Sequence, residues 1–246
     1  MHEHSLSLNQ WADFFCNLHR RGVRLLHSSK EYDSFGLLCD VLAEIRSRDC
    51  GVQFKHVVKL AEPSFDDERF DALRLGQKVD AYLSALVCDR LDTVQWMWRR
   101  DLDDDVKRIR DMARATPHIA AVFETLKAEG KIVYVGCFPY SVDFASEVSG
   151  SKMIDRLIFY RNPLEKDYDH LLEKCIVSGK KVIALRPFAA GMAFQEPTRT
   201  AVDLIKYALG HECVAGTVFT ATKSEHVDAI FLPNGEDERS RVWLTG

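Results

Sequence analysis

The sequence has no CxxC pair, and none of its apolar runs approaches the roughly 18 to 20 residues that a membrane-spanning helix needs. Its first residues, MHEHSLSL, lack the basic segment and apolar core of a signal peptide. The seven cysteines are odd in number and scattered, which indicates buried free thiols in a reducing compartment rather than a disulfide framework. These absences predict a cytoplasmic protein without a membrane partner.

The chain also lacks an excess of positive charge. Its formal net charge is −4 at pH 7 and its isoelectric point is near 6.1, so neither nucleic acid nor an anionic membrane surface is an expected partner. Hydrophobic residues make up 46% of the 246 residues and charged residues 28%, which is enough apolar material for a well-buried core. No low-complexity linker divides the sequence, so we expect one domain covering residues 1–246.

Metal and thiol chemistry have few candidates. His2 and His4 could form a weak metal site with the terminal amine, but a solvated chain end is the preferred interpretation, and we expect no metal. Cys137 follows a predicted strand and is the one candidate for a reactive thiol, although a buried thiol is the preferred interpretation there too.

Hydrophobic periodicity predicts strands that alternate with helices along the whole chain. Each short β-rich run is followed by a longer segment whose apolar positions recur with helical spacing. This alternation is typical of a parallel α/β fold. The predicted strands are 23–26, 56–60, 93–98, 132–137, 156–160, 181–185 and 214–219. The predicted helices are 9–21, 35–47, 66–90, one that begins near 104, one that runs from Pro117 to 129, 142–148, 168–177, 201–209 and one that begins at 224.

Polar residues gather directly after these strands. The stretch 22–35, GVRLLHSSKEYDSF, runs from a helix end through a short strand into a turn that carries His27 and Tyr32. Lys59 ends the next strand in the same way. In a closed parallel barrel the strand ends share one face, where such folds keep their chemistry, so we expect these side chains to meet there. The charged run that begins at Arg99 is interpreted as a solvated loop and helix start.

Six segments, in order, resemble the aldo-keto reductase family over about residues 11–230. GVRLLHSSKEY is similar to the segment that ends in the catalytic tyrosine, HVVKL to the strand with the catalytic lysine, and LDTVQWMW to the segment that ends in the active-site histidine. EGKIVYVGCFPYS resembles the strand that normally ends in Ser-Asn, KKVIALRPFAAGM the pyrophosphate-binding loop, and GTVFTATKSEHVDAI the last strand and the adenosine-phosphate helix. The resemblance implies a TIM-type (β/α) barrel and NADP(H)-dependent reduction of a small carbonyl compound.

In that family a tyrosine protonates the carbonyl oxygen, a lysine lowers the pKa of the tyrosine, a carboxylate holds the lysine and a histidine orients the substrate. By the resemblance, Tyr32 and Lys59 fill the first two roles; the alternative is a packed loop tyrosine and a surface lysine. His27 stands at the carboxylate position, where it could relay a proton with Tyr32 or hydrogen-bond a loop carbonyl. Trp98 stands at the histidine position, and it is expected, with Phe138, to wall a filled or narrowed substrate pocket.

The nicotinamide contacts of the family are replaced in this sequence. Phe138 and Pro139 stand in place of the Ser-Asn pair. Ile158 replaces an expected glutamine, and Ile230 an expected asparagine. The resemblance implies NADP as the cofactor, whereas these replacements predict weak or absent nicotinamide binding.

At the phosphate end of the implied cofactor site, the sequence still has residues that could bind a phosphate. Arg186 begins the loop that resembles the pyrophosphate-binding segment, and Gly191 leaves the backbone of that loop open. Thr222 and Lys223 precede the last helix, where backbone N–H groups could receive a phosphate. A nucleotide or another phosphorylated ligand is therefore a candidate partner. The alternative is that Arg186 and Lys223 are solvated loop charges.

The family's first barrel strand has no counterpart before the first helix. The residues before Asn9 are too few to supply both a strand and a substrate loop. The sequence therefore predicts a barrel with a missing or altered first strand, a truncated chain start, or a partner over the gap. Because an exposed strand edge invites association, we expect a homo-oligomer or a partner protein at this place.

The sequence leaves three functions open. The first is an NADP(H)-dependent carbonyl reductase with a degenerate site. The second is a cofactor-independent acid–base enzyme on the same barrel, a lyase, isomerase or cyclase that uses Tyr32, Lys59 and His27. The third is a non-catalytic binding or scaffold relative, since a fold alone does not determine function.

Overall fold

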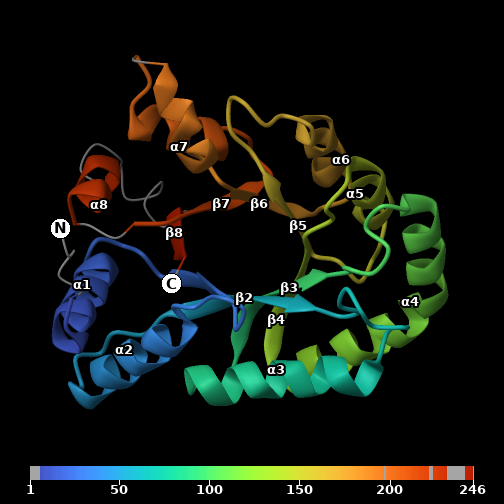
Figure 1. Ribbon diagram of the computed structural model, residues 1–246, viewed down its shortest axis with the longest axis horizontal. Helices are drawn as coiled ribbons and strands as arrows, with labels where there is room; N and C mark the ends of the chain where they lie inside the picture. Colours follow the sequence, from blue (N-terminus) through green and yellow to red (C-terminus); the bar gives the residue numbers. More distant parts are fainter. Residues whose placement is uncertain (1–5, 197, 222–223, 232–241, 246) are drawn as a thin grey trace.

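The computed structural model describes residues 6–196, 198–221, 224–231 and 242–245. In this part of the chain eight parallel strands form a closed barrel in the order β1 to β8, and the helices lie around it (Figure 1). The strands are β1 (Leu25–Ser28), β2 (Lys55–Ala61), β3 (Leu91–Met97), β4 (Ile132–Cys137), β5 (Arg156–Tyr160), β6 (Lys181–Leu185), β7 (Val214–Phe219) and β8 (Val242–Thr245). The helices are α1 (Leu8–Arg20), α2 (Phe35–Ser47), α3 (Ala72–Leu86), α4 (Asp105–Ala128), α5 (Val142–Ser149), α6 (Leu172–Val177), α7 (Ala201–Leu209) and α8 (Ser224–Phe231), with 3-10 turns η1 (Asp169–Leu171) and η2 (Ala189–Gln195). Within the described ranges, no helix has the length and apolar character to cross a bilayer.

Strand β8 closes the barrel at the place where the sequence predicts a gap. It pairs in parallel with β1, through Leu26–Leu244 and His27–Thr245, and with β7 on its other side. The prediction of a (β/α) barrel with an altered first strand is confirmed. The prediction of an exposed edge is wrong, because a strand from the far end of the chain occupies the position between β1 and β7. An exposed edge is the main reason to expect a homo-oligomer or a covering partner, and the structure removes that reason.

Helix α4 corrects a second expectation. The sequence predicts two helices divided at Pro117, whereas one helix continues through the proline. A proline inside a helix removes one backbone hydrogen bond and favours a bend, and α4 curves around the barrel in Figure 1. Ile119 and Phe123, which follow the proline, are buried, so packing against the barrel holds the second half in helical form.

The two faces of the strands fill two separate apolar layers. Side chains such as Val57 and Ile183 fill the inside of the barrel, and a larger layer lies between the barrel and the helices. Because successive residues of a strand point to opposite faces, one strand serves both layers. In β3, Met97 belongs to the inner layer and Trp96 to the outer one.

Gly136 in β4 is required by packing inside the barrel. A Cβ atom at this position would lie 2.6 Å from Cδ1 of Ile158 and 3.1 Å from Cγ2 of Thr93. Atoms at such distances overlap, so a larger residue is excluded unless its neighbours move. The isoleucine that replaces an expected glutamine thus fills the space beside β4.

Candidate active site at the barrel mouth

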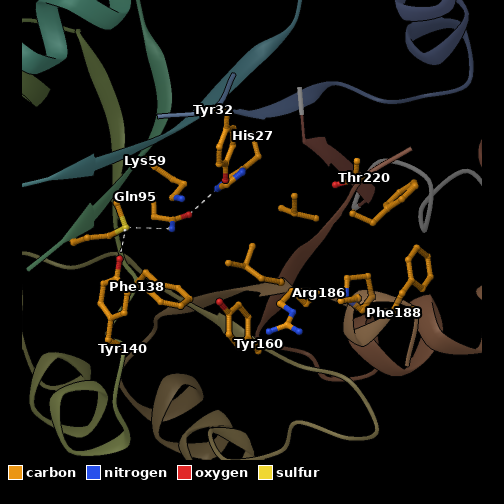
Figure 2. Close-up of a pocket in the computed structure, with 17 residues that line it drawn as sticks. His27, Tyr32, Lys59, Gln95, Phe138, Tyr140, Tyr160, Arg186, Phe188 and Thr220 are labelled. Atoms are coloured by element: carbon orange, nitrogen blue, oxygen red, sulfur yellow. Dashed lines mark hydrogen bonds between the residues drawn. The ribbon is translucent and has the colours of Figure 1, made fainter. Parts of the chain in front are cut away.

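A cavity of about 660 Å³ opens at the carboxyl ends of the strands (Figure 2). Its walls are largely aromatic, from Tyr32, Phe138, Tyr140, Tyr160, Phe188 and Phe219. Two cationic side chains, Lys59 and Arg186, line it, and His27, Gln95 and Thr220 add neutral polar groups. Among the described residues that line the cavity, none is an aspartate or a glutamate. The cavity therefore has largely apolar walls and two cationic groups in its lining, while the carboxylates nearest to them, Glu165 and Glu31, lie outside the lining.

The three residues predicted to be catalytic meet in this cavity. His27 lies in β1, Tyr32 in the loop after β1 and Lys59 in β2, and Figure 2 shows their side chains converging. The Lys59 Nζ atom lies over the Tyr32 ring, 4.7 Å from its centroid, and the His27 and Tyr32 ring centroids are 6.4 Å apart. Their proximity follows from strand ends sharing one face of the barrel. Their catalytic roles stay predictions.

Burial shifts the pKa of both Tyr32 and Lys59. Burial, and then the neighbouring Glu31 carboxylate, raise the pKa of the Tyr32 hydroxyl to about 12. The resemblance implies the opposite direction, but desolvation of the phenolate outweighs the lowering effect of the Arg99 guanidinium on this pKa. Burial also lowers the pKa of Lys59, because it disfavours the charged ammonium. Tyr32 is therefore a hydrogen-bond donor at neutral pH.

His27 is held by a side chain rather than by the loop carbonyl that the sequence favours. Its Nε2 atom lies 2.8 Å from Oε1 of Gln95, which also lines the cavity (Figure 2). Because an amide oxygen is an acceptor, Nε2 carries the ring proton. The Nδ1 atom has no hydrogen-bond partner within the part of the chain that the structure describes. Burial lowers the pKa of His27 to about 4, so the imidazole is neutral at pH 7 with a free nitrogen lone pair.

A buried arginine that the sequence analysis placed in a solvated loop supports the cavity wall. Arg99 is only 7% exposed, binds Glu31 through both Nη atoms, and donates from Nε to the Tyr140 hydroxyl at 2.7 Å. Glu31 Oε2 in turn lies 4.0 Å from Lys59 Nζ. This Arg99 network ties together the loops after β1, β3 and β4. Strand alternation could have revealed it, since Arg99 falls on the same face as Met97.

Trp98 does not line the cavity, so its predicted role as a pocket wall is wrong. It is 2% exposed in the outer layer, where its ring packs edge-on against Trp96 with centroids 6.2 Å apart. The reason is again alternation, because Met97 takes the inward position at the end of β3. Phe138 does line the cavity, with its ring centroid 4.8 Å from that of Tyr140.

The Arg99 network leads to a stability prediction. We expect Glu31→Gln to lower the free energy of unfolding by about 1 kcal/mol, because it leaves a buried guanidinium without its charged acceptor while Glu31 itself is half exposed. Urea unfolding measures the change. Glu44→Gln, which removes a helix-surface ion pair with Arg48, is the matched control and should change the free energy of unfolding much less. Equal effects of the two variants would show that the network adds nothing.

Solved structures resemble this barrel over nearly its whole length. An aldo-keto reductase of Bacillus halodurans in its holo form matches with a TM-score of 0.68 and 17% identity, covering 96% of this chain and 86% of that one. An aldo/keto reductase of Klebsiella pneumoniae, solved with NADP and acetate, matches with a TM-score of 0.64 and 18% identity over 98% and 83%. The chain has the aldo-keto reductase fold. No protein-family model and no curated protein matches it.

The resemblance stated from the sequence is thus confirmed for the fold. An aldo-keto reductase enzyme from a Medee basin deep-sea metagenome library gives the same result, with a TM-score of 0.65 and 15% identity over 96% of this chain and 86% of that one. Identities this low show a common architecture, and they leave the chemistry to be argued from the residues at the site.

Two of the residues expected to bind a cofactor phosphate do line the cavity. Arg186 lies over the Tyr160 ring, 4.7 Å from its centroid, and its Nη1 atom is 3.1 Å from Glu165 Oε1. It is therefore a fixed charge rather than a freely solvated one. Gly191 has a φ of 90°, and a Cβ atom added at this position would have no other atom within 4 Å. The backbone of Gly191 is therefore open to a ligand. Thr222 and Lys223 lie outside the described residues.

The nicotinamide end of the aldo-keto reductase fold does not fit a nicotinamide here. Phe138 offers no side-chain hydrogen bond, and the Pro139 carbonyl oxygen accepts from buried Arg108 at 2.9 Å. Ile158 is fully buried inside the barrel, and Ile230 is buried in the outer layer. A carboxamide placed beside these side chains would lose its hydrogen bonds to water without gaining others, which is unfavourable.

The sequence offers Cys137 as a candidate reactive thiol, and His2 and His4 as a candidate metal site. Cys137 is fully buried, and burial raises its pKa to about 12, so its thiol is protonated and shielded. The preferred interpretation of Cys137 as a buried free thiol is confirmed, and the alternative of a reactive thiol is wrong. His2 and His4 lie outside the described residues. Within the ranges that the structure describes, no group of three or more His, Cys, Asp or Glu side chains could hold a metal ion.

Proposed function

We propose that the barrel-mouth cavity binds a small anionic carbonyl compound and that Tyr32, Lys59 and His27 transfer protons on it without a cofactor, as in a lyase, an isomerase or a cyclase. The observation that carries the proposal is the composition of the cavity, which gathers these three residues with Arg186 and has no carboxylate in its described lining. Two cationic groups that face a cavity without carboxylates in its described lining favour an anion there.

The aromatic walls narrow the substrate class further. Phe138, Tyr140 and Tyr160 lie in edge or tilted contact on one side of the cavity, and Phe188 and Phe219 lie on the other. Such walls favour a flat or apolar body, while Arg186 and Lys59 favour a carboxylate or phosphate attached to it. A compound with a carbonyl group, an aromatic body and an anionic group satisfies all three features.

The proposed mechanism uses the protonation states that the environment sets. The Tyr32 hydroxyl, which stays protonated, donates a hydrogen bond to the carbonyl oxygen, and Lys59 stabilises the negative charge that develops there. Nδ1 of the neutral His27 is buried in the free protein, so the ring must turn out of its hydrogen bond with Gln95 before it can accept a proton from the adjacent carbon. The electron pair of the broken C–H bond then moves through the carbon framework to the oxygen. Return of the proton to the same or another carbon completes an exchange or an isomerisation.

Reduction of a carbonyl with NADP(H) is the second candidate. It is favoured by the fold, which this chain shares with the Klebsiella pneumoniae protein solved with NADP and acetate. Arg186 and Gly191 could receive a phosphate group of that cofactor. Phe138 and Ile158 count against it, because they leave the carboxamide without partners.

Deuterium exchange tests the first candidate. We expect the protein alone to accelerate exchange at the carbon next to the carbonyl of phenylpyruvate in D2O, as followed by NMR. Tyr32→Phe should lower the accelerated rate by about 100-fold or more, because it removes the donor to the oxygen. Tyr134→Phe, near the amino-terminal end of β4 beneath Arg156 and absent from the cavity lining, is the control and should keep the full rate. Exchange at the uncatalysed rate, or no effect of Tyr32→Phe, would contradict the proposal.

A further inference from the structure

Lys59 lacks the close carboxylate that fixes the other cation of the cavity. Arg186 pairs with Glu165 at 3.1 Å, whereas the Lys59 Nζ atom lies 4.0 Å from Glu31, beyond hydrogen-bond distance. Both oxygens of Glu31 are already held by Arg99. Among the described residues, no hydrogen bond fixes the Lys59 amine.

The replacement at position 27 explains this freedom. The resemblance places a lysine-holding carboxylate where this chain has His27, and the hydrogen bond of that imidazole goes to Gln95 instead. Unlike a carboxylate, a neutral imidazole carries no negative charge that could hold an ammonium group. Lys59 therefore keeps its place at the strand end and loses its fixed counter-ion, and Figure 2 shows its amine at the edge of the cavity.

The surroundings also favour the reactive, neutral form of the amine. Burial lowers the pKa of Lys59, Glu31 acts in the opposite direction, and the Arg99 guanidinium lowers it further. A neutral amine is a nucleophile, whereas an ammonium group is not, and desolvation beside a second cation is a known way to activate a lysine.

We propose that Lys59 binds the carbonyl substrate covalently as an imine. This inference rests on the proposed function and names how the substrate is held. The Nζ lone pair forms a bond to the carbonyl carbon, the π electrons move to the oxygen, and the Tyr32 hydroxyl relays one of the nitrogen's protons to that oxygen, which gives a neutral carbinolamine. The carbinolamine then takes up a proton from solvent and loses water, which leaves a protonated imine. Hydrolysis reverses the sequence, so no oxidant or reductant is required.

The positions of Tyr32 and Glu31 suit the cation that this step creates. The protonated imine nitrogen would lie over the Tyr32 ring face, where the amine is already 4.7 Å from the centroid, and Glu31 is near enough to balance its charge. A protonated imine withdraws electrons from the adjacent carbon more strongly than a carbonyl does. Loss of the proton on that carbon then becomes easier.

Reductive trapping tests the imine. The full-length protein is incubated with 4-formylbenzoate, an aromatic aldehyde with a carboxylate, and sodium cyanoborohydride, which converts an imine to a stable secondary amine. We expect intact mass to show one added group per chain and peptide mapping to place it on Lys59. Lys59→Arg, which keeps the charge, should lose the adduct, and Lys55→Arg, at the exposed start of the same strand, should retain it. Labelling spread evenly over the surface lysines, or an undiminished adduct in Lys59→Arg, would overturn the proposal.

The phenylpyruvate exchange rate separates the imine from the proposed function. If Lys59 acts covalently, Lys59→Arg should lose about 100-fold or more of the accelerated exchange, while thermal unfolding shows that it stays folded. Accelerated exchange in the wild-type protein with no trapped adduct would overturn the imine and keep proton transfer. An adduct on Lys59 without accelerated exchange would keep the imine and overturn the proposed proton transfer.

Discussion

The free energy of unfolding is expected to fall by about 4 kcal/mol when the pH is lowered from 7 to 5, because two buried imidazoles stay neutral in the folded protein. His27 and His56 are each 3% exposed, and burial lowers the pKa of each from 6.5 to about 4. In the unfolded chain they take up protons below pH 6.5, whereas the folded protein does so only near pH 4. The unfolded state therefore binds more protons in this window, and acidification removes about 2 kcal/mol of stability for each histidine.

Urea unfolding at pH 7 and pH 5 measures this dependence. Burial also lowers the pKa of the partly buried His19, which adds to the loss in the same direction. The folded protein lowers the pKa of Glu31, Asp71 and Asp203 as well, but these carboxyl groups titrate below the window. His56→Leu removes one titrating group from the outer side of β2, away from the cavity, and should reduce the loss by about half. An equal loss in the variant and the wild-type protein would show that buried neutral histidines are not its cause.

Gly136→Val is expected to destabilise the protein by about 3 kcal/mol, because the new side chain overlaps Ile158 and Thr93 inside the barrel. Ile158→Ala alone should cost a similar amount, about 3 kcal/mol, by leaving a cavity in the same layer. The double variant removes as many carbon atoms at position 158 as it adds at position 136. We therefore expect its loss to be about 2 kcal/mol or more below the sum of the single losses.

Thermal and urea unfolding of the four proteins in this cycle give the coupling energy. Gly76→Ala is the control glycine, since it lies in helix α3 with no atom within 4 Å of a built Cβ, and it should stabilise the protein by up to about 1 kcal/mol. Additive losses at positions 136 and 158 would show that the two side chains do not compete for the same space.

The barrel could be predicted from the sequence because its strands and helices have strong local signals. Strands β4 to β7 have the predicted bounds, and so does α7. The bounds of β8 could not be found in this way, since four residues are too short to establish alternation and their partners, β1 and β7, are distant in sequence. Pro117 misled the prediction for α4, because tertiary packing outweighed a local helix-breaking residue.

The site was predictable where a residue type and a strand end coincide, as at Tyr32 and Lys59. It was not predictable where the answer depends on which face a side chain takes. The sequence predicts Trp98 in the pocket wall and Arg99 in a solvated loop. In the structure Trp98 packs outward against the helices, and Arg99 faces the site. The role of Glu31, one of the polar residues in the turn after the first strand, could not be predicted either, because it depends on Arg99, which is distant in sequence.

The central claim is that this barrel keeps Tyr32 and Lys59 but acts without nicotinamide. Titration of the purified protein with NADPH, following the cofactor's fluorescence and the melting temperature of the protein together, tests it most directly. The loss of carboxamide partners at Phe138 and Ile158 predicts no saturable binding up to about 1 mM, which corresponds to a binding free energy of only about −4 kcal/mol. Saturable binding in the micromolar range, with a matching rise in melting temperature, would contradict the claim and make carbonyl reduction the function to pursue.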